Sequence, residues 1–131
     1  MTLVFDTSIL IDIEKDIEKT LVKIEGLSKI YKAPAQITFI SYYEFLRGLK
    51  IGKPKKYSNL LGFINNFNMV KITKKTADIL SDLKVKYDAL GITLSLTDLL
   101  IASQIIENRL ILVTKDNHFL QIEELNKIIL D

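Results

Sequence analysis

The chain has no cysteine, and only one histidine and two prolines among its 131 residues. Without cysteine it has no disulfide framework, no thiolate zinc site and no cysteine nucleophile. A single histidine, His118, also excludes metal sites built from several imidazoles and acid–base schemes that need a histidine pair. Any metal ion would therefore be held mainly by oxygen atoms, which favours Mg²⁺ or Mn²⁺.

The sequence also lacks a long apolar run, because charged residues recur throughout the chain, and no segment is suited to crossing a bilayer. The N-terminus has no basic region, and Asp6 and Asp12 interrupt its apolar stretch, which argues against a signal peptide. The absence of cysteine fits a reducing compartment. We therefore expect a cytoplasmic protein that does not associate with membranes.

The composition is that of a globular protein with a small excess of positive charge. Apolar residues make up 48% of the chain, enough for a packed core, and we expect one domain spanning residues 1–131. The net charge of +2 does not by itself indicate a nucleic-acid binder. Lysines nevertheless gather within residues 50–56 and 71–75. A basic rim beside an acidic pocket suits a polyanionic substrate, although lysines that merely solvate helix faces explain the same pattern.

Short apolar runs alternate with helical patterns along the chain. Strands are predicted at residues 3–5, 37–40, 69–72 and 110–114, with a further edge strand at 128–130. Helices are predicted at residues 17–27, at 77–90 before Gly91, and at 98–108, where the pattern is apolar on nearly all sides. This alternation predicts an α/β fold, a three-layer α/β/α sandwich with a mainly parallel central sheet of four or five strands.

Four acidic residues occupy positions that a ligand site in such a sheet would use. Asp6 directly follows the first predicted strand, and Asp116 follows the strand at residues 110–114. Glu44 falls on the first turn of the helix expected after the second strand, and Asp98 opens the apolar helix. Because ligands bind beyond the carboxyl ends of parallel strands, we expect these four carboxylates to gather at one edge of the sheet.

Each of the four acids also has an alternative role at a helix end or in a turn. Asp6 stands where a helix cap would, and Asp116 can open a turn with Asn117. Glu44 and Asp98 each follow a serine at the spacing of a capping box. Capping does not require all four acids on one side of a sheet, however. Crowded carboxylates repel one another and are usually neutralised by a divalent cation, so the set as a whole favours a metal site.

Four segments together resemble the PIN domain family, and in particular the VapC-type ribonuclease toxins of toxin–antitoxin systems. They are VFDTSILID, SYYEFLRG, LTDLLIAS and LVTKDNHF, in that order along almost the whole chain. The resemblance implies a PIN-like fold and an Mg²⁺- or Mn²⁺-dependent endoribonuclease that hydrolyses RNA. It also implies a cognate antitoxin protein as partner and a homodimer. The acids that match the family's quartet are Asp6, Glu44, Asp98 and Asp116.

The neighbours of the acids partly follow and partly depart from the family pattern. Hydroxyl groups of Thr7 or Ser8 and of Thr114 resemble helpers that orient a ligand or a water molecule. Leu99 stands where alanine is usual after the helix aspartate, which implies different local packing. His118 stands where the family often has an acid; we interpret it as structural in preference to a contact with substrate.

Three rival functions share parts of this pattern. A phosphatase of the haloacid dehalogenase type needs a second aspartate two residues after the first, and Ser8 occupies that position. A nuclease with the same site that acts on DNA stays open, because metal and phosphate chemistry do not distinguish the sugar. A non-catalytic PIN-like scaffold or regulatory module also stays open, and metal binding would argue against it.

Overall fold

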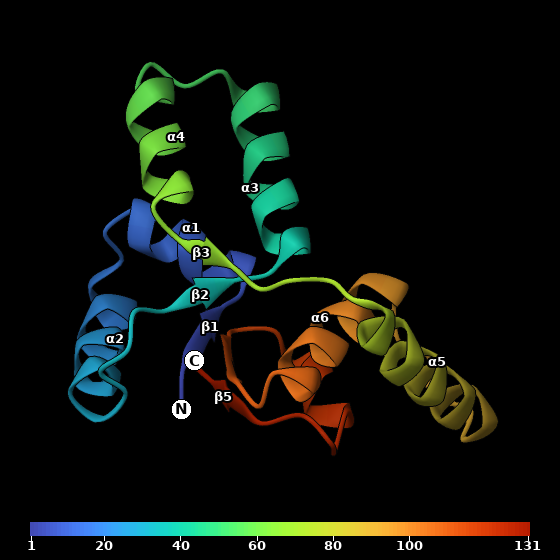
Figure 1. The fold of residues 1–131 in the computed structure, drawn as a ribbon. Helices are drawn as coiled ribbons and strands as arrows, with labels where there is room; N and C mark the ends of the chain where they lie inside the picture. The colour runs from blue at the N-terminus through green and yellow to red at the C-terminus, as the bar shows by residue number, and fades with distance from the viewer.

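The computed structural model describes residues 1–131 and contains a five-stranded sheet with helices on both faces (Figure 1). All strand pairs are parallel, and the spatial order is β3-β2-β1-β4-β5. The strands are β1 (Leu3–Phe5), β2 (Gln36–Ile37), β3 (Asn68–Met69), β4 (Ile111–Thr114) and β5 (Lys127–Ile129). The predicted α/β/α sandwich around a mainly parallel sheet is confirmed.

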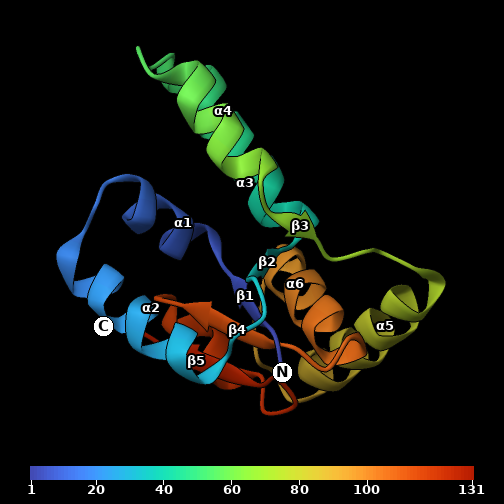
Figure 2. The ribbon, with the colours of Figure 1, turned by 60° about the vertical axis from the view of Figure 1, so that its left-hand side comes forward.

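Six α-helices and one short 3₁₀ helix connect these strands. They are α1 (Thr7–Glu14), α2 (Glu18–Ile30), α3 (Phe39–Gly52), α4 (Tyr57–Asn65), α5 (Lys74–Ala89), α6 (Leu96–Glu107) and η1 (Asn117–Gln121). Helices α1 to α4 cover one face of the sheet and α5 and α6 the other, while α3 and α4 form a hairpin that projects from the sheet (Figures 1 and 2). None of the helices combines the length and apolar character needed to span a membrane.

The central strands contribute to two separate hydrophobic cores. Leu3 and Phe5 of β1 pack into an 11-residue cluster beneath α1, α3 and α4. Val4 between them joins a 14-residue cluster with Leu112 of β4 and the buried faces of α5 and α6. Because side chains alternate along a strand, a strand covered on both faces needs apolar residues at every position, as the sequence of β4 indicates.

The second predicted strand is shorter than expected. Residues 37–40 were predicted to be extended, whereas β2 ends at Ile37 and α3 begins at Phe39. The reason is a helix cap: the Thr38 hydroxyl accepts a hydrogen bond from the Ser41 backbone N–H (3.2 Å), which starts the helix directly after the strand. Glu44 therefore lies on the second turn of α3 rather than on the first, and Ser41 is a buried first-turn residue rather than the cap.

The third predicted strand, at residues 69–72, is likewise reduced to the two residues of β3. A capping box formed by Thr73 and Thr76 starts α5 at Lys74, ahead of the predicted start. The end of α5 agrees better with the prediction, since Gly91 follows the helix with a φ of +70°, the left-handed conformation that glycine adopts readily. Helix α4 was not predicted.

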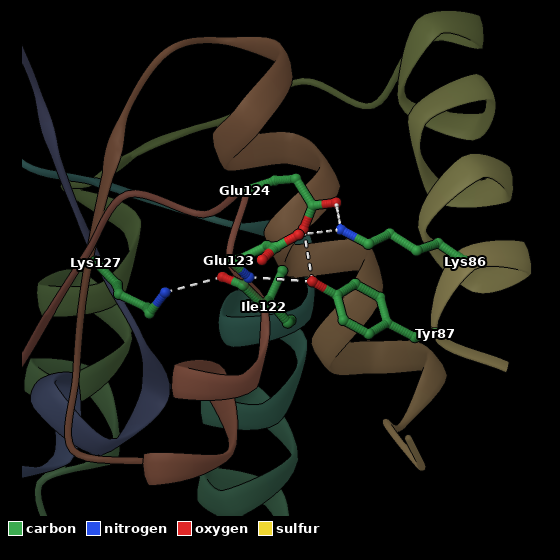
Figure 3. Close-up of polar contacts among 6 residues, drawn as sticks. All are labelled: Lys86, Tyr87, Ile122, Glu123, Glu124 and Lys127. Atoms are coloured by element: carbon green, nitrogen blue, oxygen red, sulfur yellow. Dashed lines mark hydrogen bonds and ion pairs between the residues drawn. The ribbon is translucent and has the colours of Figure 1, made fainter. Parts of the chain in front are cut away.

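A polar network ties α5 to the loop that precedes β5 (Figure 3). The buried Tyr87 hydroxyl donates to Glu124 Oε1 (2.6 Å) and accepts from the Glu123 backbone N–H (3.0 Å). The Lys86 ammonium bonds both of these glutamates. Lys127, which begins β5, donates to two backbone carbonyl oxygens of the same loop. These contacts hold β5 beside β4, the strand that leads to Asp116.

We expect Tyr87→Phe to lower the free energy of unfolding by about 1–3 kcal/mol, because the Glu123 N–H loses its acceptor in a partly buried place. Urea unfolding monitored by circular dichroism measures the change. Tyr43→Phe is the matched control, because Tyr43 is 52% exposed and its hydroxyl has no hydrogen bond within the chain. Equal stabilities of wild type and Tyr87→Phe would contradict a structural role for the network.

Candidate metal centre

The candidate site lies where the connections of the sheet change direction. Helices α1 and α2 leave β1 on one face, whereas α5 and α6 lead into β4 on the other, and β1 and β4 are neighbours. Asp6 directly follows β1, and its backbone N–H donates to the Val113 carbonyl of β4 (3.0 Å). Asp116 follows β4 after one intervening residue. The carboxyl ends of adjacent strands at such a point form the usual ligand crevice of open α/β sheets.

The Asp6 side chain points into this crevice instead of capping α1. Asp6 is 8% exposed, makes no side-chain cap bond, and accepts from Thr114 Oγ1 at Oδ2 (2.7 Å) and from Ser41 Oγ at Oδ1 (3.5 Å). Burial raises the pKa of the Asp6 carboxyl, and the negative charges of Glu44 and Asp116 raise it further, while the Thr114 hydrogen bond opposes them. The capping alternative therefore does not describe Asp6.

Glu44 reaches the same crevice from α3. The Thr7 hydroxyl, on the first residue of α1, donates to Glu44 Oε1 (2.6 Å), and Glu44 is otherwise exposed. Thr7 and Thr114 thus each hold one of the predicted acids in place. Ser8, the alternative to Thr7 as a helper, instead accepts from the backbone N–H of Lys115 (3.1 Å) and fixes the turn after β4.

Asp98 and Asp116 lie close together, with His118 beside them. One ligand atom from each of these three residues lies within 4.8 Å of the other two. Asp116 Oδ1 accepts from the His118 backbone N–H (2.9 Å) and lies 3.0 Å from His118 Nδ1. Ser95 caps α6, because its hydroxyl accepts a hydrogen bond from the Asp98 N–H (3.1 Å), as the capping-box spacing predicts. This bond uses the backbone of Asp98 and leaves its carboxylate free to bind a ligand.

The pKa is raised at Asp98 as well as at Asp6. Burial raises the pKa of the Asp98 carboxyl, and the charges of Asp116 and Glu44 raise it further, whereas His118 and the Ser95 hydrogen bond lower it. Asp116 and Glu44 also act on Asp6, so the crevice holds a single electrostatic cluster. Asp6 and Glu44 lie outside the tight group of three, and which acids bind a cation directly stays a prediction.

The donor set fits a divalent cation because the protein supplies no cation of its own to the cluster. None of the four acids forms an ion pair with lysine or arginine, and the only charged partner near any of them is His118, beside Asp116. Several carboxylate oxygens and one imidazole nitrogen are ligands that divalent metal ions accept. A bound cation would favour the charged form of Asp6 and Asp98, whose pKa is raised first by burial and then by the neighbouring carboxylates.

A supporting contact that the sequence analysis did not identify involves Asp12. Asp12 is buried on α1 and accepts from Lys115 Nζ (2.8 Å) and from Thr20 Oγ1 of α2 (2.5 Å). Lys115 precedes Asp116, and Asp12 holds its ammonium group away from the acids. The sequence offered one sign of this contact, because Asp12 is a charged residue within an apolar run, four residues after Ser8.

Comparisons with known proteins agree with this fold. The PIN domain family model matches residues 3–125 of the chain. No curated protein gives a significant match. VapBC2 from Rickettsia felis, bound to a DNA fragment from its promoter, has a similar structure, with a TM-score of 0.81, 24% identity and 100% coverage of both chains. A toxin–antitoxin complex from Klebsiella pneumoniae has a TM-score of 0.75, 23% identity and 95% coverage of both chains. VapBC-1 from nontypeable Haemophilus influenzae has a TM-score of 0.79, 20% identity and 98% coverage of both chains.

We expect Asp12→Asn to lower the free energy of unfolding at pH 7 by about 1–3 kcal/mol, because Lys115 and Thr20 lose a charged acceptor. The hydrogen bond from Lys115, followed by that from Thr20, lowers the pKa of Asp12 below its ordinary 3.8. A lowered pKa stabilises the fold above the unfolded-state pKa, and this contribution is lost as the pH falls through the folded-state pKa.

The difference in stability between wild type and Asp12→Asn should therefore be constant above about pH 5 and shrink below about pH 4. Urea unfolding across this pH range measures it. Glu14→Gln is the matched control on the same helix, since the Glu14 carboxylate has no ion pair or hydrogen bond. A difference in unfolding free energy that grows as the pH falls would contradict a stabilising role for the Asp12 carboxylate.

Proposed function

The chain belongs to the PIN domain family, and from that premise we propose that it is a metal-dependent endoribonuclease that hydrolyses RNA phosphodiester bonds. The observation that carries the proposal is the cluster of acids beyond β1 and β4, which has no lysine or arginine partner. Cleavage of a phosphodiester needs negative charge to be neutralised and water to be activated. A crevice of uncompensated carboxylates suits both requirements once it holds a cation.

We assign the catalytic and metal-binding roles to Asp6, Glu44, Asp98 and Asp116, with Mg²⁺ or Mn²⁺ as the ion and one domain, residues 1–131, carrying the activity. A divalent cation bound there would polarise a phosphoryl oxygen and lower the pKa of its own water ligand. The chain's own contribution is orientation. Thr114 holds Asp6 from within and Thr7 holds Glu44 at the rim, so both carboxylates are positioned before a ligand arrives.

The distribution of lysines supports a nucleic acid as substrate. Exposed lysines without ion pairs occupy the end of α3, the loop to α4, the connection from β3 to α5 and the start of α5. They are Lys50, Lys53, Lys55, Lys56, Lys71, Lys74 and Lys75. The α3–α4 hairpin projects from the sheet, so its tip adds positive charge well beyond the acidic crevice (Figure 2). Such an arrangement favours an extended polyanion that contacts both regions.

We further propose a cognate antitoxin protein as partner, a homodimer as the assembly and the cytoplasm as the site of action. The similar folds from Rickettsia felis, Klebsiella pneumoniae and Haemophilus influenzae, which belong to toxin–antitoxin complexes, support the first of these. A groove of about 410 Å³ between α1, α3 and α4 leads from Glu44 along apolar residues such as Phe45, Leu49 and Leu60. An antitoxin segment seated there would block the crevice at Glu44.

We expect Asp6→Asn to reduce RNA cleavage by at least about a hundredfold, because loss of a metal ligand exceeds the effect of changing its supporting groups. The melting temperature of the ligand-free variant should not fall, since a buried charge with a raised pKa is removed. Asp78→Asn on the exposed side of α5 is the control and should cut like wild type.

The assay compares single-stranded RNA, structured tRNA and single-stranded DNA of matched sequence, with Mg²⁺ or Mn²⁺ and with a chelator. Cleavage of both RNA substrates but not of DNA is the expected result. Equal cleavage of DNA would replace ribonuclease by general nuclease, and a folded Asp6→Asn protein that cuts at the wild-type rate would refute the metal-centred mechanism.

A triple change of the hairpin tip, Lys53→Glu, Lys55→Glu and Lys56→Glu, tests the basic surface. We expect the KM for single-stranded RNA to rise at least about tenfold at low salt while kcat changes less than about twofold, because phosphate contacts add affinity without taking part in the chemistry. The slope of log KM against log salt should fall by about two, since each phosphate contact to a single strand contributes about 0.7.

The control carries the same charge change on α2, at Lys19 and Lys29, and just after it, at Lys32; all three are exposed and unpaired on another part of the molecule. It should behave like wild type apart from a small effect of net charge. If both triple variants raise KM equally, the hairpin tip has no specific role in binding RNA.

A further inference from the structure

His118 is the one histidine of the chain, and its imidazole faces two of the acids assigned above. We propose that His118 is a nitrogen ligand of the cation in this crevice and that it makes the site prefer a first-row transition-metal ion, such as Mn²⁺ or Co²⁺, over Mg²⁺. This inference rests on the proposed metal centre and concerns which ion the centre selects. It replaces the interpretation of His118 as a structural residue.

The geometry allows the three groups to bind one ion with small movements. Ligand atoms on opposite sides of an octahedral Mg²⁺-sized ion lie about 4.2 Å apart, twice the metal–oxygen distance. The atoms of Asp98, Asp116 and His118 already lie within 4.8 Å of one another. The His118 backbone N–H is bound to Asp116 Oδ1, so the turn holds the two residues together, and the imidazole is exposed and contacts only Asp116.

Packing does not account for the position of the imidazole. The His118 side chain is 73% exposed, whereas the next residue, Phe119, is 1% exposed and anchors the turn in the core. The one polar contact of the imidazole is with Asp116, and an exposed pair of this kind contributes little to stability. A side chain that neither packs nor stabilises, yet projects towards two carboxylates, is better explained as a ligand.

The chemistry of the donor determines the preference among ions. Carboxylates and water suit Mg²⁺, which keeps several of its own water molecules, whereas an imidazole nitrogen adds more for transition-metal ions. The gain rises from Mn²⁺ to Co²⁺ in the Irving–Williams order. An imidazole beside several carboxylates should therefore bias the centre in a graded way rather than exclude Mg²⁺.

The direct test is pulsed electron paramagnetic resonance of Mn²⁺ bound to protein from which any affinity tag has been removed. Coupling to an imidazole nitrogen can arise from His118 alone, because the chain has no other histidine. We expect this coupling in the wild type and its loss in His118→Ala. Asn117→Ala, in the same exposed turn, is the control and should retain it.

Isothermal titration with Mg²⁺, Mn²⁺ and Co²⁺ measures the preference itself. We expect His118→Ala to raise the Kd for Co²⁺ by more than about tenfold, the Kd for Mn²⁺ by less, and the Kd for Mg²⁺ by less than about twofold. His118→Asp, which substitutes an oxygen donor, should bind Mg²⁺ at least as well as wild type. Thermal unfolding of each variant checks that the exposed substitutions leave the fold intact.

The outcomes separate this inference from the proposed function. Mn²⁺ that binds the wild type without imidazole coupling, and with the same preference in His118→Ala, would overturn the role of His118 and leave the metal centre intact. A wild-type protein that binds none of the three ions would overturn the metal centre and the inference with it.

Discussion

The parallel pairing of β1 with β4 is the constraint on which the rest of the structure depends. The register sets Phe5 beside Val113, so the next residues along each strand, Asp6 and Thr114, meet at the same edge. The hydrogen bond between them spans 108 residues of sequence. The same two strands carry apolar side chains into both cores. A shift of register by one residue would turn each side chain of the shifted strand toward the opposite core, and it would also separate Thr114 from Asp6.

The acidic crevice is electrostatically unfavourable without a ligand, and the surrounding chain preserves this property. A lysine placed among the acids would neutralise them, but it would also occupy the space of a cation. Lys115 is adjacent to Asp116 in the sequence, yet its ammonium is bound by Asp12 on the other side of the turn. The pKa is raised at Asp6 and Asp98, whereas it is lowered at Asp12, which has a lysine partner. Stability and cation binding would therefore be opposed at the proposed metal centre.

Sequence reasoning found the central strands and most of the helices, but it missed α4 and failed where one side chain decides. The four consecutive buried residues of β4 identify a central strand, and the rule about strand ends placed the four acids at one edge. The strands β2 and β3 have two residues each, too few for a periodic pattern, and the caps at Thr38 and Thr73 set where the helices begin. The Thr7–Glu44 and Asp12–Lys115 contacts join distant segments, so no local pattern reveals them.

The acids of the crevice differ in burial, and a substitution therefore has different effects at a buried position and at an exposed one. Asp6 is buried and held by hydroxyl groups of neighbouring elements, so it changes only if the sheet changes. Glu44 and His118 are exposed, and each has a single polar contact at its tip. Substitution at the exposed positions alters the donors offered to an ion without disturbing either core. In the proposed metal centre, Asp6 would therefore keep its place while the exposed side chains, Glu44 and His118, set which donors the site offers.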